Sequence, residues 1–413
     1  MNKNVLYISY DGLTDPLGQS QILPYLIGLS KEGYSFHIIS FEKPARFEQH
    51  KDFIQEICDT NNIIWHPLTY TKRPPLLSTM WDVHRMKKCA LRLHMEHSFS
   101  IVHCRSYLSA LVGLRLQHKG VKFVFDMRGF WADERIEGGI WRKENPLFRV
   151  VYNYFKRKEQ LFFQKADKVI SLTQKGKDEI LSWKKRSISA DKITVIPCCV
   201  DTVLFDPETI NPHQQRELKK SLGIKEDDFV LGYVGSIGTW YMLDEMLDCF
   251  KVIAENKSTA KMMFVTGENP NEIIKKATAK GIERNRLIFT STVHKYVPLH
   301  ISLFDWSIFF IRPTFSKKAS SPTKQGEIMA MGVPVICNAG VGDTDKIIHD
   351  YQSGIVLNEL NETAYRQLEL TAYNSTKLRQ GAIEFFSLEE GVRRYAAVYA
   401  AFDSAQSAQI AAE

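Results

Sequence analysis

The sequence of 413 residues lacks several features that mark particular classes of protein. Its seven cysteines are scattered with no Cys-x-x-Cys pair, and a chain this long needs no disulfides, so we expect reduced thiols in a cytoplasmic setting. No apolar run approaches the length of a membrane span, about 18 residues, and the first residues lack an apolar signal-peptide core. No internal repeat or low-complexity segment is present, which leaves an ordinary globular composition.

The net charge of +7 is modest, but the positive excess is concentrated in one stretch. Residues 142–186 carry 13 Lys or Arg against five Asp or Glu, with aromatic residues between them. Such a stretch suits an anionic membrane surface, or it forms two solvated helices with apolar inner faces. We expect no nucleic-acid partner, because no nucleic-acid-binding motif accompanies the charge.

Apolar, β-prone runs alternate with helical patterns along both halves of the chain. In the first half we expect strands at 5–10, 35–41, 100–104, 122–126, 168–172 and 193–196. Helices are expected between them at 19–32, 47–59, 81–97, 108–118, 146–166 and 174–184. A second set of strands is expected at 229–234, 261–266, 286–290, 306–311, 333–337 and 354–357. The alternation predicts two parallel, doubly wound sheets, each in a domain of about 200 residues.

The stretch 320–336 reads as a loop, a short helix, a turn and a buried strand. Ser321 is a good N-cap, and Pro322 suits the first helical position, where its missing N–H costs nothing. Gly332 can end the helix in a left-handed conformation. The apolar run 333–337 then suits a parallel strand covered on both faces.

The start of this helix has the chemistry of an anion site. Its free N–H groups and dipole favour an anion, and Ser321, Thr323 and Lys324 add two hydroxyls and a cation. Glu327 lies one turn further along, where a carboxylate can accept hydrogen bonds from the vicinal hydroxyls of a ribose. An anion site followed by a diol site is the layout that a nucleoside diphosphate needs. The alternative is a well-capped surface helix of an α/β domain.

The segment 321–327, Ser-Pro-Thr-Lys-Gln-Gly-Glu, and the Ile-Met-Ala-Met-Gly-Val-Pro-Val-Ile that follows resemble a known signature. They are similar to the second half of the Glu-x7-Glu signature of retaining family-4 glycosyltransferases, in the form of a bacterial Ser-Pro-Thr-Lys-x-Gly-Glu subgroup. The first Glu of that signature falls on Ala319, so one carboxylate is missing. Residues 196–205 resemble the interdomain segment of the family, with Cys198-Cys199 in place of Asn-Gly.

The resemblance covers essentially the whole chain and implies the GT-B fold, an α/β architecture of two Rossmann-like, doubly wound domains facing across a cleft. It implies an N-terminal acceptor-binding domain at 1–202, with a C-terminal crossover helix at 386–413 packed on it. The nucleotide-sugar-binding domain is then 203–385.

In the second domain the resemblance also points to the loop after the first strand. Gly235 and Ser236 lie in this loop, where the family carries an Arg and a Lys that neutralise the diphosphate. Here Ser236 and Tyr241 take those places, so Lys324 is expected to supply a missing cation, with Arg312 as a second candidate. Further along the chain, relatives border the nucleotide base with the loop at 293–298.

In that loop Tyr296 is expected to stack on the base and Val297 to read its edge through backbone groups; loop packing explains both residues equally well. In the first domain Gly18 is expected to contact the diphosphate or the acceptor, and a plain strand-to-helix turn is the alternative. Arg128 occupies the place where many relatives have a His that contacts the donor sugar. Asp126 and Arg128 are therefore candidate catalytic residues, or else a structural ion pair.

The function implied is transfer of a hexosyl group from a nucleotide-diphosphate sugar to a glycan, lipid-linked or small-molecule acceptor, with retention of configuration, in polysaccharide biosynthesis. Helix N-termini and Lys324 would stabilise the departing diphosphate, so we expect no metal and no cofactor. Peripheral contact with the anionic inner face of the membrane is also expected. The alternatives are a non-catalytic family member that binds a nucleotide sugar or a partner glycosyltransferase, and a sugar-nucleotide epimerase. An NAD enzyme is disfavoured by the missing G-x-G-x-x-G motif.

Overall fold

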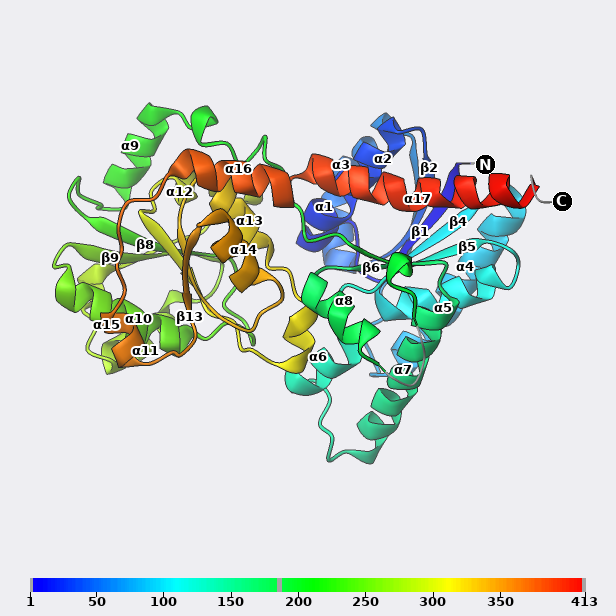
Figure 1. Cartoon of the computed structure of the whole chain (residues 1–413), viewed down its shortest axis with the longest axis horizontal. Helices are drawn as coiled ribbons and strands as arrows, with labels where there is room; N and C mark the ends of the chain where they lie inside the picture. The colour runs from blue at the N-terminus through cyan, green and yellow to red at the C-terminus, as the bar shows by residue number, and fades with distance from the viewer. Residues whose placement is uncertain (1–2, 184–187, 411–413) are drawn as a thin grey trace. The chain divides into compact units, whose positions relative to one another are not determined.

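The computed structural model describes residues 3–183 and 188–410, and the chain divides into two compact units (Figure 1). Unit 1 runs up to Pro197 and resumes at Leu388, whereas unit 2 is Cys198–Ser387. Each unit contains a sheet whose strands all pair in parallel, with helices between successive strands. The predicted α/β class with two Rossmann-like sheets is therefore confirmed.

The sheet of unit 1 has the strand order β3-β2-β1-β4-β5-β6-β7. Its strands are β1 (Asn4–Ser9), β2 (Ser35–Glu42), β3 (Ile63–Thr69), β4 (Ile101–Arg105), β5 (Lys122–Asp126), β6 (Lys168–Ser171) and β7 (Ile193–Val195). The helices of this unit are α1 (Pro16–Gln21), α2 (Leu23–Lys31), α3 (Pro44–Thr60), α4 (Leu77–His97), α5 (Ser106–Gln117), α6 (Trp131–Glu137), α7 (Pro146–Lys165), α8 (Gln174–Leu181) and α17 (Leu388–Ile410). The apolar runs of the central strands are buried, as strands covered on both faces require.

The sheet of unit 2 has the order β10-β9-β8-β11-β12-β13. Its strands are β8 (Phe229–Val234), β9 (Ala260–Val265), β10 (Leu287–Thr290), β11 (Trp306–Phe309), β12 (Val335–Asn338) and β13 (Gly354–Leu357). Its α-helices are α9 (Pro212–Ser221), α10 (Leu243–Asn256), α11 (Pro270–Ala279), α12 (Val297–Ile301), α13 (Thr323–Ala330), α14 (Thr344–Tyr351), α15 (Glu362–Arg366) and α16 (Ser375–Phe386). Unit 2 also contains the short 3-10 helices η4 (His294–Tyr296) and η5 (Phe315–Ala319).

In both sheets the strand order reverses once, between β1 and β4 in unit 1 and between β8 and β11 in unit 2. Ligands of open parallel sheets bind outside the carboxyl ends of the strands at such a reversal. The loops that leave β1 and β8 are the loops predicted to bind ligand, and each starts at the reversal of its own sheet. The topology of each unit therefore identifies one edge as the place to look for a site.

Three elements differ from the sequence prediction. Strand β3 was not predicted, because Pro67 weakens its pattern; the proline is tolerated since β3 is an edge strand. The predicted helix 19–32 is two helices, α1 and α2, with a break at Ile22, two residues before Pro24. Helix α6 was also not predicted, since it has only two turns and little periodicity.

The loop between β1 and α1 is held by a buried carboxylate from β2. Glu42 accepts hydrogen bonds from the backbone N–H groups of Leu13 (2.8 Å) and Thr14 (3.1 Å) and from the Thr14 hydroxyl (2.5 Å). Gly12 is required beside it, because a Cβ there would lie 2.6 Å from a Glu42 oxygen. The carboxylate thus replaces the strand hydrogen bonds that the loop gives up where it leaves the sheet.

Helix α17, red in Figure 1, returns to unit 1 and packs beside α2. Val392 fills the space left by Gly28, where a Cβ would meet Val392 at 2.4 Å. The ring of Tyr395 contacts that of Tyr25, with centroids 5.2 Å apart. The chain end therefore belongs to the core of unit 1, although it follows unit 2 in the sequence.

We predict that Gly18→Ala destabilises unit 1. A Cβ at Gly18 in α1 would lie 2.1 Å from the Gly12 carbonyl oxygen, and backbone cannot yield as a flexible side chain can. The clash should cost about 1–3 kcal/mol despite the better helix propensity of Ala. Differential scanning calorimetry should show a lower melting temperature. Gly267→Ala is the control, since nothing lies within 4 Å of a Cβ there; equal melting temperatures for both variants would contradict the prediction.

Candidate active site

Helix α13 begins at Thr323, with Pro322 as its N-cap residue. The prediction that Ser321 caps this helix is wrong, because its hydroxyl accepts a hydrogen bond from the Cys198 backbone N–H instead, at 3.1 Å. Gly332 ends the helix with φ +70°, as predicted. The Ser321 hydroxyl therefore ties α13 to the first residue of unit 2, and its contact with a ligand stays a prediction, like that of Thr323.

Lys324 lies in an aromatic enclosure beside the loop that follows β8. Its Nζ donates to the Tyr233 hydroxyl at 3.0 Å and lies over the rings of Tyr233 and Tyr241, 4.1 Å and 3.7 Å from their centroids. The Tyr233 hydroxyl in turn donates to the Ser236 carbonyl at 2.6 Å. A side chain at Gly235 would lie 3.4 Å from Nζ. The cation of α13 therefore lies directly against the loop predicted to lack one.

Burial changes the charge state of this lysine. The residue is 8% exposed, and desolvation lowers the pKa of Lys324 to about 7, although the nearby Glu327 carboxylate partly opposes the shift. Near neutral pH the free protein is thus poised between the amine and the ammonium. A bound anion would favour the ammonium, so binding of a diphosphate here should draw in a proton.

Glu327 lies one turn further along α13, and its carboxylate is already engaged on one side. His294 of η4 places Nε2 3.1 Å from Glu327 Oε1. The hydrogen bond to Glu327 raises the pKa of His294, against the opposing effect of burial. Sequence reasoning assigned no role to His294 or Tyr233; the available signal was a polar side chain at or just after the carboxyl end of a strand.

The structure also places the residues predicted to border a base. Tyr296 is half exposed and follows His294 in η4, so its ring is accessible beside the histidine that contacts Glu327. The backbone N–H of Val297 already donates to the His294 carbonyl, so reading a base edge with this group would require that bond to break. Both assignments stay predictions.

In unit 1 the strand β5 ends at Asp126, which is fully buried in a cluster of polar side chains. Its Oδ2 accepts from the Tyr395 hydroxyl at 3.1 Å and lies 3.5 Å from His103 Nε2 and 3.8 Å from an Arg128 guanidinium nitrogen. His103 Nδ1 lies 2.7 Å from the Tyr399 hydroxyl. The structure therefore brings Asp126 and Arg128 together, but as members of a network that fastens α17 to the sheet.

The neighbours of Asp126 and His103 determine the charge state of each side chain. Burial alone would raise the pKa of Asp126, but the Arg128 guanidinium and the His103 hydrogen bond hold it below its usual value. Burial lowers the pKa of His103 despite Asp126, so the imidazole stays neutral at pH 7. Arg128 adopts φ +56°, a backbone conformation that costs a non-glycine residue of order 1–3 kcal/mol and that recurs at functional sites.

Gly18 lies inside α1 rather than on an exposed loop. Its missing side chain makes room for the Gly12 carbonyl, which gives the residue a packing role. The predicted contact of Gly18 with a diphosphate or an acceptor stays a prediction.

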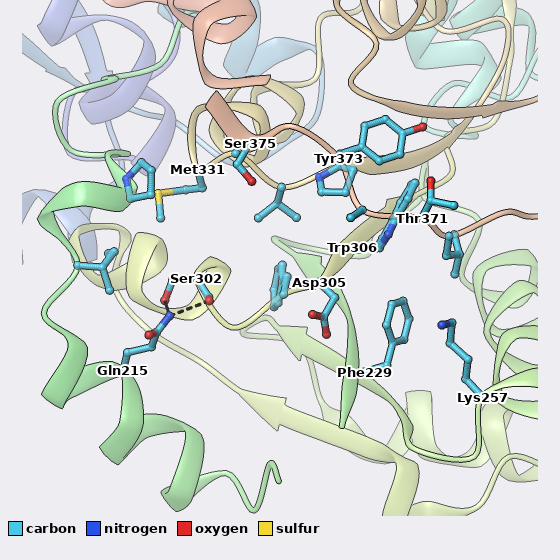
Figure 2. Close-up of a pocket in the computed structure, with 18 of the residues that line it drawn as sticks. Gln215, Phe229, Lys257, Ser302, Asp305, Trp306, Met331, Thr371, Tyr373 and Ser375 are labelled. Carbon is cyan, nitrogen blue, oxygen red and sulfur yellow. Dashed lines mark hydrogen bonds between the residues drawn. The ribbon is translucent and has the colours of Figure 1, made fainter. Parts of the chain in front are cut away.

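A cavity of about 650 Å³ lies at the end of the unit 2 sheet opposite to the candidate site, and Figure 2 shows the residues that line it. Phe229 and Trp306, the first residues of β8 and β11, line it together with Lys257, Asp305 and Tyr373. It lies at the amino ends of the strands, away from Lys324 and Glu327, which follow carboxyl ends. We therefore place the candidate site at α13 and not in this cavity.

Among the residues that the structure describes, no group of three His, Cys, Asp or Glu side chains is arranged to hold a metal ion. A helix long and apolar enough to cross a bilayer is likewise missing from the described part of the chain.

Two parallel-sheet, Rossmann-like units in one chain place the protein in the GT-B fold class. Residues 25–204 match the family model "Glycosyltransferase Family 4", and residues 214–384 match "Glycosyl transferases group 1". The chain therefore combines a Glycosyltransferase Family 4 domain with a Glycosyl transferases group 1 domain. These domains support a transferase and imply a nucleotide-sugar donor and an acceptor. A comparison with curated proteins finds no significant match.

Solved structures are similar over nearly the whole chain. A glycosyltransferase from Rickettsia africae ESF-5 has a TM-score of 0.67 at 16% identity, covering 96% of this chain and 97% of that chain. Sucrose-phosphate synthase from Thermosynechococcus elongatus has a TM-score of 0.67 at 15% identity, covering 97% and 99%. A putative UDP-N-acetylglucosamine 2-epimerase from Listeria monocytogenes has a TM-score of 0.61 at 15% identity, covering 98% of both. At such identities the likeness shows the fold alone.

We predict that anion binding at α13 is coupled to protonation of Lys324. Because the pKa of the free lysine is about 7, affinity for UDP should be greatest near or below neutral pH and fall as the pH rises toward about 9, by at most tenfold per pH unit. Isothermal titration calorimetry in buffers of different ionisation enthalpy should show proton uptake above about pH 7. Lys324→Met should bind more weakly and lose this uptake. Equal uptake by both proteins would assign the proton to another group.

Proposed function

We propose that this protein is a retaining glycosyltransferase of the hexosyl type that uses a nucleotide-diphosphate sugar. The observation that carries the proposal is the arrangement on α13, where Lys324 lies against Gly235 in the loop after β8 and Glu327 lies one turn further along. The first position suits a diphosphate and the second a ribose diol. The Ser-Pro-Thr-Lys-x-Gly-Glu pattern supports the same assignment through the subgroup that it resembles.

The proposed chemistry is mainly electrostatic. When the bond to the sugar breaks, negative charge develops on the leaving diphosphate, and a buried cation beside it lowers the barrier more than an exposed one would. Lys324, the N–H groups at the start of α13 and the Ser321 and Thr323 hydroxyls are proposed to supply that stabilisation. The leaving phosphate takes the acceptor proton on the face from which it departs, which retains the configuration. The proposal calls for no metal or cofactor.

Unit 1 is proposed to bind the acceptor, which is a glycan, a lipid-linked sugar or a small molecule. Arg128 is proposed to reach the reacting groups with its planar guanidinium. Asp126 is fully buried and surrounded by His103, Tyr395 and Arg128, so we propose that it orients Arg128 and does not touch substrate. The strained backbone at Arg128 supports a functional role for that residue.

Two alternatives remain as outcomes of the same assays. A family member without activity would bind a nucleotide sugar but neither transfer nor hydrolyse it. A sugar-nucleotide epimerase, the activity ascribed to the Listeria neighbour, would return a nucleotide sugar with an altered sugar and require no acceptor. A thermal-shift screen of UDP-, GDP-, ADP-, TDP- and CMP-sugars identifies the donor, because a specific ligand raises the melting temperature by mass action. Product analysis then separates the three functions.

We predict that Glu327→Ala and Lys324→Ala each reduce affinity for the donor found in that screen by about tenfold to a hundredfold. Each removes a charged hydrogen bond of about 1.5–3 kcal/mol to the ribose or to the diphosphate. Calorimetric titration gives the affinity, and unchanged circular dichroism shows that the variants are folded. Glu272→Ala and Lys251→Ala are matched controls, since both side chains are exposed in the same unit. Wild-type affinity in both site variants would refute the donor site.

We also propose that unit 1 meets its acceptor at an anionic membrane surface, through the start of α7. Leu147, Val150 and Tyr154 form an exposed apolar stripe at helical spacing, 55%, 65% and 45% exposed, with the exposed Arg149 and Arg157 close by in the sequence. This part of α7 and the turn before it extend away from the unit 1 sheet in Figure 1. Such a face suits the interface of a bilayer with anionic lipids.

The structure changes which basic residues should take part. Lys156 is not a solvated surface charge, because its Nζ lies 2.7 Å from Asp133 Oδ2 and also contacts the buried Glu159. Lys184, which belongs to the same basic stretch 142–186, lies outside the described residues. Charge reversal at Lys156 would therefore disturb packing inside unit 1.

We predict weak co-sedimentation of the protein with anionic vesicles, at about 1 kcal/mol per well-placed basic side chain, which fades at high salt. Arg149→Glu with Arg157→Glu should abolish it without unfolding the protein. Lys251→Glu with Lys275→Glu, which reverses exposed charges in unit 2, should leave it unchanged. Equal sedimentation with neutral vesicles, or no sedimentation at low salt, would favour a soluble acceptor.

A further inference from the structure

We infer that His294 is a positioning residue that holds the Glu327 carboxylate in the orientation needed to bind the ribose of the donor. This inference rests on the proposed function, because it concerns the same donor site. It adds a residue that neither the sequence motif nor the family models assign.

The contact is well defined on both sides. His294 Nε2 lies 3.1 Å from Glu327 Oε1, and the Glu327 side chain is 12% exposed. On its other side the imidazole packs against Phe205, with ring centroids 5.4 Å apart at 58°. Phe205 is fully buried, so it provides a rigid support. The imidazole is thus held between a core ring and a carboxylate, although half of its surface is exposed.

The chemistry of the two groups fixes the direction of the hydrogen bond. A carboxylate only accepts hydrogen bonds, so His294 must carry a proton on Nε2 and donate it. Glu327 and, more weakly, Asp201 favour the protonated imidazole, which keeps this donor in place. Lys324 is the nearby cation of α13, and its pKa also responds to Glu327. The Glu327 carboxylate therefore accepts a hydrogen bond from the histidine of η4 and acts electrostatically on the lysine of its own helix.

One donated hydrogen bond leaves most of the carboxylate available. Two carboxylate oxygens offer about four lone-pair sites, and His294 uses one of them. Both vicinal hydroxyls of a ribose can therefore still donate to Glu327. What His294 removes is the freedom of the side chain to rotate, so less side-chain entropy is lost when the ribose binds.

The experiment compares UDP, GDP and ADP with their 2′,3′-dideoxy forms, using the pair whose parent nucleotide binds the wild-type protein most tightly. Calorimetric titration is carried out on the full chain for the wild type, His294→Ala, His294→Gln and Glu327→Gln. His349→Ala is the matched control, because His349 is exposed in α14 of the same unit. All titrations use one buffered pH, and the parent-to-dideoxy ratio is taken within each protein, so a change in Lys324 protonation, which affects both forms alike, cancels.

We expect the wild type to bind the dideoxy form about tenfold more weakly than the parent, which is the loss of a hydrogen bond to a charged group. In His294→Ala this ratio should fall to about two- to threefold, through weaker binding of the parent alone. His294→Gln should restore much of the ratio, since its amide N–H can donate to Glu327. Glu327→Gln should lower the ratio as well, and His349→Ala should match the wild type.

Other outcomes identify which idea is wrong. If His294→Ala weakens both forms equally, or strengthens binding of the parent, then His294 does not position Glu327 and the inference fails while the donor site stands. If the wild type binds none of the three nucleotides and no nucleotide sugar in the donor screen, the proposed donor site itself fails.

Discussion

A lysine buried between two tyrosine rings is the constraint on which the proposed donor site depends. Desolvation makes the ammonium of Lys324 costly, and the rings of Tyr233 and Tyr241 together with the Glu327 carboxylate offset only part of that cost. The site is thus short of negative charge next to a cation that is only partly formed at neutral pH. A bound diphosphate would supply negative charge beside Lys324 and would favour its protonated form. Its binding would therefore recover part of the desolvation cost of the ammonium.

The sequence could predict much of the fold because parallel sheets covered on both faces need long apolar runs, which stand out against amphipathic helices. Edge strand β3 was missed for the converse reason, since Pro67 weakens that signal. At the site, Lys324 and Glu327 could be placed because they share one helix. His294 could not, because its partner is 33 residues away and the contact depends on how η4 packs.

In unit 1 the contacts between residues far apart in the sequence were even harder to predict. Asp126 and Arg128 are close in sequence, and their proximity was predictable from the strand end. Their environment was not, because the Tyr395 hydroxyl that contacts Asp126 comes from a helix 269 residues later. A polar network that joins the last helix to the central sheet makes the candidate catalytic arginine depend on the return of the chain end.

The loop after β8 lacks the two cations that the resemblance leads one to expect, and the structure places a lysine from another segment against this loop. Ser236 and Tyr241 cannot neutralise a diphosphate, but the ring of Tyr241 lies 3.7 Å from Lys324 Nζ, and the backbone of Gly235 leaves room for that group. Next to Tyr241, Trp240 receives a second lysine, Lys317 of η5, with Nζ 3.7 Å from the ring centroid. Both cations come from the segment between β11 and β12, which lies next to β8 across the reversal of the sheet. Because these lysines come from the segment between β11 and β12 and not from the loop after β8, packing between the two segments holds them in place. Burial can then determine the charge of such a lysine.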